Sequence, residues 1–361
     1  MEMETQSRIG KAVRTKTRTH DGADHLDIPV LPLLIVSLIV LFLLSINLGR
    51  FGIPIDQFAG FVLDKTFGMH FSYPATIETV LMNIRIPRIF AAILVGTALS
   101  ASGASYQGLF KNPMVSPDIL GAAAGAGFGA ALAILLSFNT VGIQISAFAF
   151  GLLAVMLSYL LSRAIGKGSN VILILVLTGI VMESMFAALT SAIKYVADPD
   201  SKLPEITFWL MGSLSRLLGM GDILKLLIPV GIGILPLYLL RWKINVLSFG
   251  EEEAIAMGVN TKRLRLVIIA CSTLLTACAI SVSGMVGWVG LVVPHISRML
   301  VGPNYKKLLP VSMVTGGIFL LAVDDVARSA ISIEIPLGIL TALIGAPFFV
   351  FLLLRGKKGW L

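Results

Sequence analysis

The sequence predicts an all-α polytopic membrane protein with about ten transmembrane helices. Hydrophobic residues make up 56% of the chain and charged residues only 13%, whereas about a quarter of an ordinary soluble domain is charged. The mean hydropathy is +0.91. Apolar blocks of membrane-spanning length also recur from one end of the chain to the other. Together these observations exclude a soluble globular protein.

The predicted spans follow from the position of each apolar block, with about 20 residues expected per helix and some shorter or broken ones. They fall at residues 30–49, 87–110, 118–137, 142–163, 171–193, 222–241, 265–286, 287–301, 308–328 and 335–354. The eighth block is short and contains Pro294. Two mixed segments interrupt the pattern. Residues 51–84 include an expected amphipathic helix at 55–67, and residues 198–221 include a short apolar piece at 208–214.

The charges predict the orientation of the chain. Residues 1–28 are polar and basic and show no signal-peptide pattern, which is typical of a short cytosolic tail. Most other Lys and Arg residues fall in loops on the same side as this tail, so both termini are expected in the cytosol. A permease domain is expected at 29–355 and a second cytosolic tail at 356–361. The formal charge of +8 reflects these loops, and nucleic-acid binding is not expected.

Motifs for catalysis or metal binding are absent from the sequence. It contains no Walker A loop, HExxH motif, nucleophile elbow or cluster of metal ligands, so we expect neither an enzyme nor a metal site. Cys271 and Cys278 lie seven residues apart on one predicted helix, which separates their Cα atoms by about 10 Å, beyond the reach of a disulfide.

Small residues form ridges on two predicted spans and predict close helix packing. Their positions are Gly96, Ser100, Ala104, Gly121, Gly125 and Gly129. A pattern S-x-S-G-x9-P also occurs twice, on spans of opposite predicted direction, which could mark an inverted internal repeat or arise by chance. Its positions are Ser100, Ser102, Gly103, Pro113, Ser281, Ser283, Gly284 and Pro294.

One polar stretch interrupts the apolar runs near the centre of the chain. Residues 247–266 read LSFGEEEAIAMGVNTKRLRL. Acids in the first turn of a helix suit the helix dipole, which explains the three glutamates without any partner. Gly258 is the expected turn between two short helices. The stretch as a whole has the character of a docking surface.

Four separated motifs then resemble the FecCD family, the permease subunits of ABC importers for ferric siderophores, haem and cobalamin. They read RIPRIFAAILVGTALSASGASYQGLFKNPMVSPDILGAAAGAGFGA, FGEEEAIAMGV, GWVGLVVPHISRMLVG and DDVARSAISIEIPLGILTALIGAPFFVFLL. The resemblance covers about residues 30–355. It implies ten-helix subunits that form a homodimer, or a heterodimer, in the inner membrane of a prokaryote, with the translocation path along the dimer interface.

The resemblance also implies the partners. Two ATPase subunits, which use ATP and Mg, would bind on the cytosolic side, and a periplasmic or lipid-anchored binding protein would dock outside; this chain itself would hold no cofactor. Arg85, Arg88 and Arg328 match the arginines that meet glutamates of the binding protein. Interfacial anchoring is the alternative for the first two. For Arg328 the alternative is an ion pair with Asp324 or Asp325, of which Asp325 departs from the family pattern.

The polar central stretch matches the pair of short cytosolic helices that rest on the ATPase in the family, here the coupling loop 242–264. A coupling element must be short and stiff if movement of the ATPase is to reach the spans. The resemblance assigns ATPase coupling to Glu252, Glu253, Ala254, Met257 and Gly258. Of these we expect Ala254, Met257 and Gly258 to form the compact contact face.

Glu183 falls near the middle of the fifth predicted span, where an acid is costly and usually faces a cavity or a partner. We expect it to line the translocation path, with a protonated packing acid as the alternative. Ser169 and Asn170 are expected near an inner gate. The most consistent function is an ATP-driven permease for a metal chelate. An ion-coupled secondary transporter that uses Glu183 and Asp324 is the alternative.

Overall fold

A computed structural model describes residues 29–49, 51–69, 71, 73–166, 171–216 and 219–356. Every regular element in this part of the chain is a helix. The predicted tail 1–28, residues 357–361 of the other predicted tail, and the expected gate residues Ser169 and Asn170 lie outside the described residues.

Ten helices occupy the ten predicted blocks. They are α2 (Val30–Asn47), α5 (Ile86–Phe110), α6 (Ala122–Leu135), α7 (Thr140–Ile165), α8 (Val171–Val196), α10 (Met220–Leu239), α13 (Thr261–Ser283), α14 (Val289–Val301), α15 (Tyr305–Ser329) and α16 (Leu337–Gly356). Within the described residues, seven helices are long and apolar enough to cross a membrane, and α6, α14 and α16 are shorter apolar helices. The predicted all-α membrane fold is confirmed.

Short helices fill the segments between the spans. They are α3 (Ile55–Phe67), α4 (Ala75–Thr79), the π-helix η1 (Val80–Arg85), the 3-10 helix η2 (Pro117–Leu120), α9 (Lys202–Met211), α11 (Arg241–Leu247) and α12 (Glu251–Ala256). Helix α5 begins at Ile86, one residue before the predicted start of the second span, and α4 and η1 extend it on the N-terminal side to a continuous helix of 36 residues from Ala75 to Phe110. Pro87 lies in the first turn of α5, where a proline fits because the helix does not need its amide hydrogen there.

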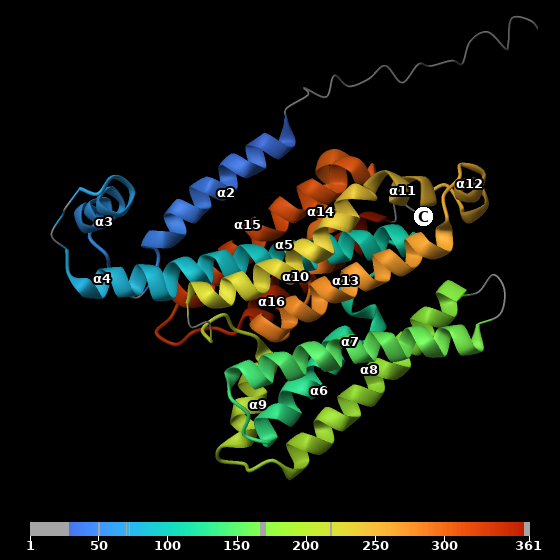
Figure 1. Cartoon of the computed structure of the whole chain (residues 1–361), viewed down its shortest axis with the longest axis horizontal. Helices are drawn as coiled ribbons and strands as arrows, with labels where there is room; N and C mark the ends of the chain where they lie inside the picture. The colour runs from blue at the N-terminus through green and yellow to red at the C-terminus, as the bar shows by residue number, and fades with distance from the viewer. Residues whose placement is uncertain are drawn as a thin grey trace, which may run out of the picture.

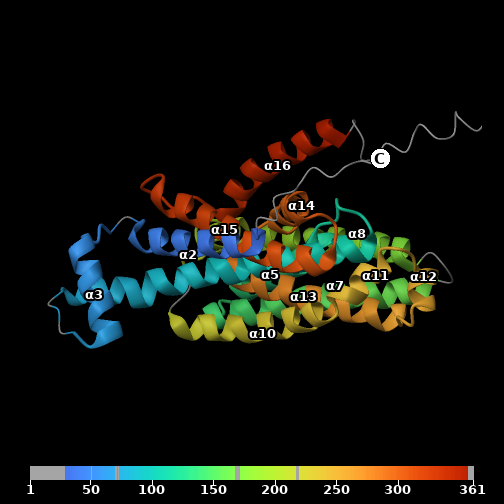
Figure 2. The same ribbon diagram turned by 90° about the horizontal axis from the view of Figure 1, so that it is seen from above.

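The long helices lie side by side along one direction, as Figure 1 shows. Helices α3, α4 and α9 gather at one end of this bundle, and α11 and α12 gather at the other. We refer to them as the α9 end and the α12 end. Figure 2 shows α16 leaning away from the bundle, beside α14 and α15.

Backbones approach closely along α5, the helix at the centre of the bundle. A Cβ atom on Gly96 would lie 2.1 Å from the carbonyl oxygen of Gly316 on α15, and one on Gly103 would lie 1.8 Å from that of Gly290 on α14. Only glycine leaves room for these contacts, which replace hydrophobic burial as the source of helix association in lipid. The predicted small-residue packing is therefore confirmed.

The two copies of the S-x-S-G pattern occupy different places in the structure. Gly103 lies inside α5, whereas Gly284 ends α13 with φ = 70°. These four matching positions therefore do not mark equivalent points of two repeats. Cys271 and Cys278 are both buried and free, as predicted.

Candidate functional site

The three arginines with predicted docking roles all lie at the α9 end, and all three are buried. Arg88, in the first turn of α5, binds two carboxylates at once. Its Nε donates to both oxygens of Asp324 at 3.0 Å, and its Nη2 donates to Asp324 Oδ1 at 2.7 Å. Its Nη1 and Nη2 donate to the two oxygens of Glu334 at 3.1 and 2.9 Å. The planar guanidinium is suited to such paired contacts.

Arg85 and Arg328 instead close the end of α2. Arg328 donates to the carbonyl oxygens of Ser45 and Leu48, both at 2.7 Å, and Arg85 donates to the carbonyls of Ile46 at 2.5 Å and of Phe51. The last carbonyls of a helix have no partner inside the helix. The two guanidinium groups supply donors to them.

The alternative predicted for Arg328 is present in the structure, because its Nη2 also donates to Asp325. Asp324 lies 3.6 Å from Arg328 and makes its shorter contacts with Arg88. Asp325, the departure from the family pattern, accepts a further hydrogen bond from Ser45 on α2. The three arginine side chains point into the protein. Their docking role stays a prediction.

Glu334 is the residue of this cluster that the sequence did not reveal. It lies in the loop between α15 and α16, and its side chain is 25% exposed, whereas that of Asp324 is fully buried. Ser213, in the segment that follows α9, donates to Glu334 Oε1 at 2.7 Å. The sequence feature that could have pointed to Glu334 is its position as a lone acid in the apolar run SAISIEIP.

At the α12 end, the short helix α12 is fixed to the rest of the chain on one side. Glu251 pairs with Arg265 of α13. The predicted coupling residue Ala254 is fully buried, and its carbonyl accepts a hydrogen bond from Val259 at 2.9 Å. Gly258 turns the chain towards α13 with φ = 78° and has open space beside it. A rigid, short element results.

The exposed side of this end differs from the predicted contact face. Ala254 faces inwards, and the exposed apolar side chains are Met257 (58%), Ile255 (60%) and Phe249 (68%). The last two were not in the predicted set. Glu252 and Glu253 are exposed in the first turn of α12, as expected for acids at a helix start.

Glu183 lies on the side of α8 that this chain leaves exposed. Its exposed neighbours on that side include Ser184, Ala187 and Ser191. Helix α2 offers a comparison, because its exposed large residues are purely apolar, such as Val36 and Val40. The exposed serines of both helices bond to their own backbone, as Ser184 does to Ile180 and Ser37 to Leu33. The carboxylate of Glu183 therefore distinguishes the face of α8 from the lipid-compatible face of α2.

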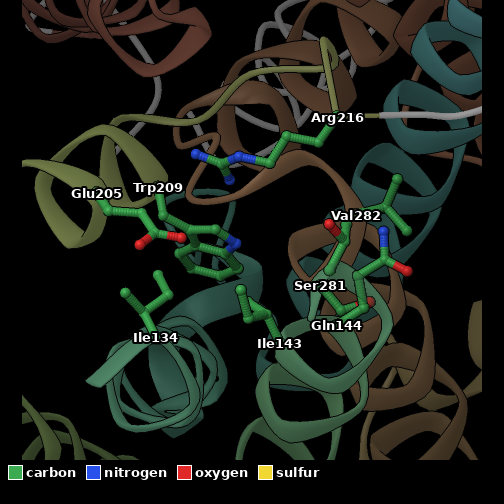
Figure 3. Close-up of a pocket in the computed structure, with 9 residues that line it drawn as sticks. Ile134, Ile143, Gln144, Glu205, Trp209, Arg216, Ser281 and Val282 are labelled. Carbon is green, nitrogen blue, oxygen red and sulfur yellow. The ribbon is translucent and has the colours of Figure 1, made fainter. Parts of the chain in front are cut away.

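A small cavity at the α9 end does not provide a substrate site. It is lined by parts of α6, α7, α9 and α13. Its volume of about 70 Å³ is far less than the roughly 300 Å³ of a small-molecule site. Figure 3 shows Arg216 and Glu205 both reaching towards Trp209, whose ring centre lies 5.9 Å from the Arg216 guanidinium carbon. Among the described residues, no three His, Cys, Asp or Glu side chains are grouped as metal ligands.

Comparison with known proteins identifies the family. The model of the FecCD transport family matches residues 37–355. The chain belongs to the FecCD transport family. It is 39% identical over 326 residues to the molybdate import system permease protein MolB of Haemophilus influenzae, covering 90% of this chain and 95% of that protein.

Two further comparisons agree. This FecCD permease is 41% identical over 288 residues to the cobalamin import system permease protein BtuC of Halobacterium salinarum, covering 79% of this chain and 76% of that protein. A solved structure in an inward-facing conformation, described as a metal-chelate type ABC transporter, matches it with a TM-score of 0.80 and 38% identity, over 91% of this chain and 99% of that chain.

Family membership settles several points. The chain is a permease subunit of an ABC importer and is not itself an enzyme. It is a multi-pass protein of the inner membrane, and its family works with ATPase and binding-protein partners. No comparison supports an ion-coupled transporter.

Proposed function

We propose that this permease forms a homodimer that carries a metal chelate, namely a ferric siderophore, haem or cobalamin, across the inner membrane. ATP hydrolysis in two partner ATPase subunits drives the transport. The observation that carries the proposal is the exposed side of α8, where Glu183 and small polar residues lie on a helix of a membrane protein. Such a surface requires water or a second protein surface opposite it.

The path then lies between two copies of the chain, with α8 of each copy along it. Small side chains such as Ser184 and Ala187 leave room for a bulky substrate. The cavity inside one copy has about 70 Å³ and could not hold any of these chelates. Transport therefore needs the interface between subunits.

Glu183 favours a chelate over an oxyanion as the substrate. In its ionised form, Glu183 of each subunit would place a negative charge near mid-membrane. Like charges repel strongly where the surroundings are poor in water, so a small dianion such as molybdate would meet a barrier. A large chelate with spread charge and apolar groups would meet a smaller one.

The α12 end is the side we assign to the cytosol and to the ATPase, and we keep the prediction that both termini are cytosolic. Helix α12 combines a fixed inner side, through Ala254 and the Glu251–Arg265 pair, with three exposed apolar side chains outside. A stiff element with an apolar tip can transmit ATPase movement to α11 and α13. The α9 end, with Arg85, Arg88 and Arg328, is the side we assign to the binding protein.

The structure gives Asp324 no role as a free cation site, which counts against ion coupling. Its carboxylate is fully buried and accepts three hydrogen bonds from Arg88. Because Arg88 occupies both of its oxygens, this carboxylate leaves no open position for a transported cation. Only Glu183 remains of the two acids on which that mechanism depends.

Uptake into proteoliposomes tests the substrate and the energy source. The permease, reconstituted with its ATPase and binding protein, should accumulate a labelled ferric siderophore, haem or cobalamin only when ATP is inside. Comparable uptake of labelled molybdate would contradict the chelate assignment. Uptake driven by a proton gradient without ATP would contradict the mechanism.

Cysteine cross-linking tests the interface. Ser184→Cys on the exposed side of α8 should form a cross-linked dimer in native membranes with a bifunctional thiol reagent. Val36→Cys on the apolar side of α2 is the matched control and should remain monomeric. The reverse pattern would place α8 against lipid and remove the proposed path.

A further inference from the structure

Arg88 holds two carboxylates that differ in how easily another molecule could reach them. Asp324 is fully buried behind the arginine, whereas the side chain of Glu334 is 25% exposed. Glu334 makes a two-point contact, with its oxygens 2.9 and 3.1 Å from Nη2 and Nη1. It thus occupies the outward edge of the guanidinium, the edge that a carboxylate from outside would need.

Glu334 also ties two loops together at the α9 end. Ser213 donates to it from the segment after α9, and nearby the amide of Leu337 donates to the carbonyl of Gly212 at 3.0 Å. Through Glu334, both loops are attached to the start of α5. Loss of this one carboxylate contact would release the loop at residues 330–336 and the segment that follows α9 from Arg88.

Arg88 has two carboxylate partners only while Glu334 is in place. The three buried arginines lie among three carboxylates, those of Asp324, Asp325 and Glu334. If Glu334 leaves, Arg88 keeps Asp324, but Nη1 and one contact of Nη2 lose their acceptor in a largely buried position. Buried donors without an acceptor are costly, so another carboxylate is favoured in its place.

We propose that Glu334 is an internal substitute for an acidic side chain of the binding protein, and that docking exchanges one carboxylate for the other on Arg88. The exchange detaches the 330–336 loop from Arg88 at the moment of docking. This inference rests on the proposed docking at the α9 end, and it specifies how a buried arginine takes part. It also makes Glu334 a positioning residue that holds the α9 end closed in the free permease.

The surroundings of Glu334 define the partner surface. Ile331 and Ile333, in the same loop, are 56% and 73% exposed. A complementary surface would carry a Glu or Asp with apolar side chains next to it. Polar and charged groups at such a contact would set its register, and the apolar groups would supply buried area.

Measurement of docking affinity with Glu334→Gln tests the exchange. Glutamine keeps the size of the side chain but removes the competing charge, so Arg88 is open to the partner more of the time. Apparent affinity rises with the fraction of molecules that can bind. The substrate-loaded binding protein of this system should bind the full transporter in nanodiscs about tenfold more tightly, mainly through faster association.

Glu205→Gln is the matched control. It removes a carboxylate at the same end, where Glu205 pairs with Lys202, and its affinity should stay within about twofold of the wild type because only long-range attraction changes. Ser213→Ala should tighten docking by less than Glu334→Gln, since it removes only one hydrogen bond to Glu334. A merely structural role for Glu334 would weaken docking in the Gln variant or leave it unchanged.

The outcomes separate the two proposals. Wild-type transporter that binds the protein, with an unchanged or weakened Glu334→Gln variant, would overturn the exchange and leave the docking assignment intact. Wild-type transporter that does not bind the protein at the α9 end at all would overturn the docking assignment itself.

Discussion

The two ends of the permease present opposite chemistry. At the α9 end, Arg85, Arg88 and Arg328 are buried and bound to acceptors of the same chain. At the α12 end, Phe249, Ile255 and Met257 are exposed and apolar. The α9 end therefore buries its arginines beside the exposed Ile331 and Ile333, and the α12 end exposes its apolar side chains beside Glu252 and Glu253.

This difference suits the two kinds of partner we propose. A binding protein must dock and leave in each cycle, and buried charges that have to be exchanged make docking reversible and selective. An ATPase stays attached, and an exposed apolar surface favours lasting association. At both ends, the burial of a side chain and its bonding partners identify the proposed contact residues.

The largest expected effect comes from bulk at the α12 end. Gly258→Trp should abolish ATP-driven uptake while leaving the permease inserted in the membrane. The glycine has φ = 78° and open space beside it, so an indole would project into the surface that we assign to the ATPase. Uptake by proteoliposomes and membrane insertion by protease protection are the measurements.

Gly258→Ala separates bulk from backbone strain. Both variants take the left-handed conformation, which costs about 1–2 kcal/mol for a residue with a Cβ atom, but only tryptophan adds volume. The alanine variant should therefore keep most of the transport. Equal loss in both variants would show that conformation, and not contact with the ATPase, is the cause.

The second effect concerns the buried pair at the α9 end. Asp324→Asn should lower the free energy of unfolding by about 3–5 kcal/mol, because it removes the charge that compensates Arg88 in a buried site. The exposed pair of Lys65 and Glu78 gives the control, since Glu78→Gln should cost about 0–1 kcal/mol. Thermal unfolding of both variants in detergent is the measurement. If the α9 cluster were solvated, Asp324→Asn would lose as little unfolding free energy as the control.

The smallest effect separates the apolar groups of the two ends. Met257→Ser should weaken association of the ATPase about three- to tenfold, as expected for one apolar contact at an interface, and leave binding-protein docking unchanged. Ile333→Ser, at the α9 end, changes a side chain that is 73% exposed, against 58% for Met257, and should do the opposite. Size-exclusion and affinity measurements on both variants check this, and identical effects on both partners would remove the distinction between the ends.

Much of the fold was readable from the sequence because a bilayer restricts the possibilities. A helix must satisfy its own backbone in lipid, so each apolar block of sufficient length becomes one helix. The amphipathic helix predicted at 55–67 appears as Ile55–Phe67. The second span, predicted at 87–110, appears as α5, Ile86–Phe110, but the sequence did not reveal that α4 and η1 extend it on the N-terminal side.

The site was only partly readable. The R-x-P-R motif and the acids of DDVAR were evident, but Glu334 lies 246 residues from Arg88, and no local pattern links them. Ala254 was expected on a contact face and is buried, because the side of a short helix that packs inwards depends on its neighbours. Ile255 and Phe249 became candidates only through their exposure.

The sequence by itself determined the membrane class, the positions of the ten helices and the family, since these depend on local apolar length and on motifs that can be read along the chain. Tertiary structure alone decided the pairing of charges. Whether Arg88, Arg85 and Arg328 are free or occupied depends on Asp324, Glu334 and the end of α2, which packing brings together from distant parts of the chain. Burial then makes those pairings costly to leave unmade.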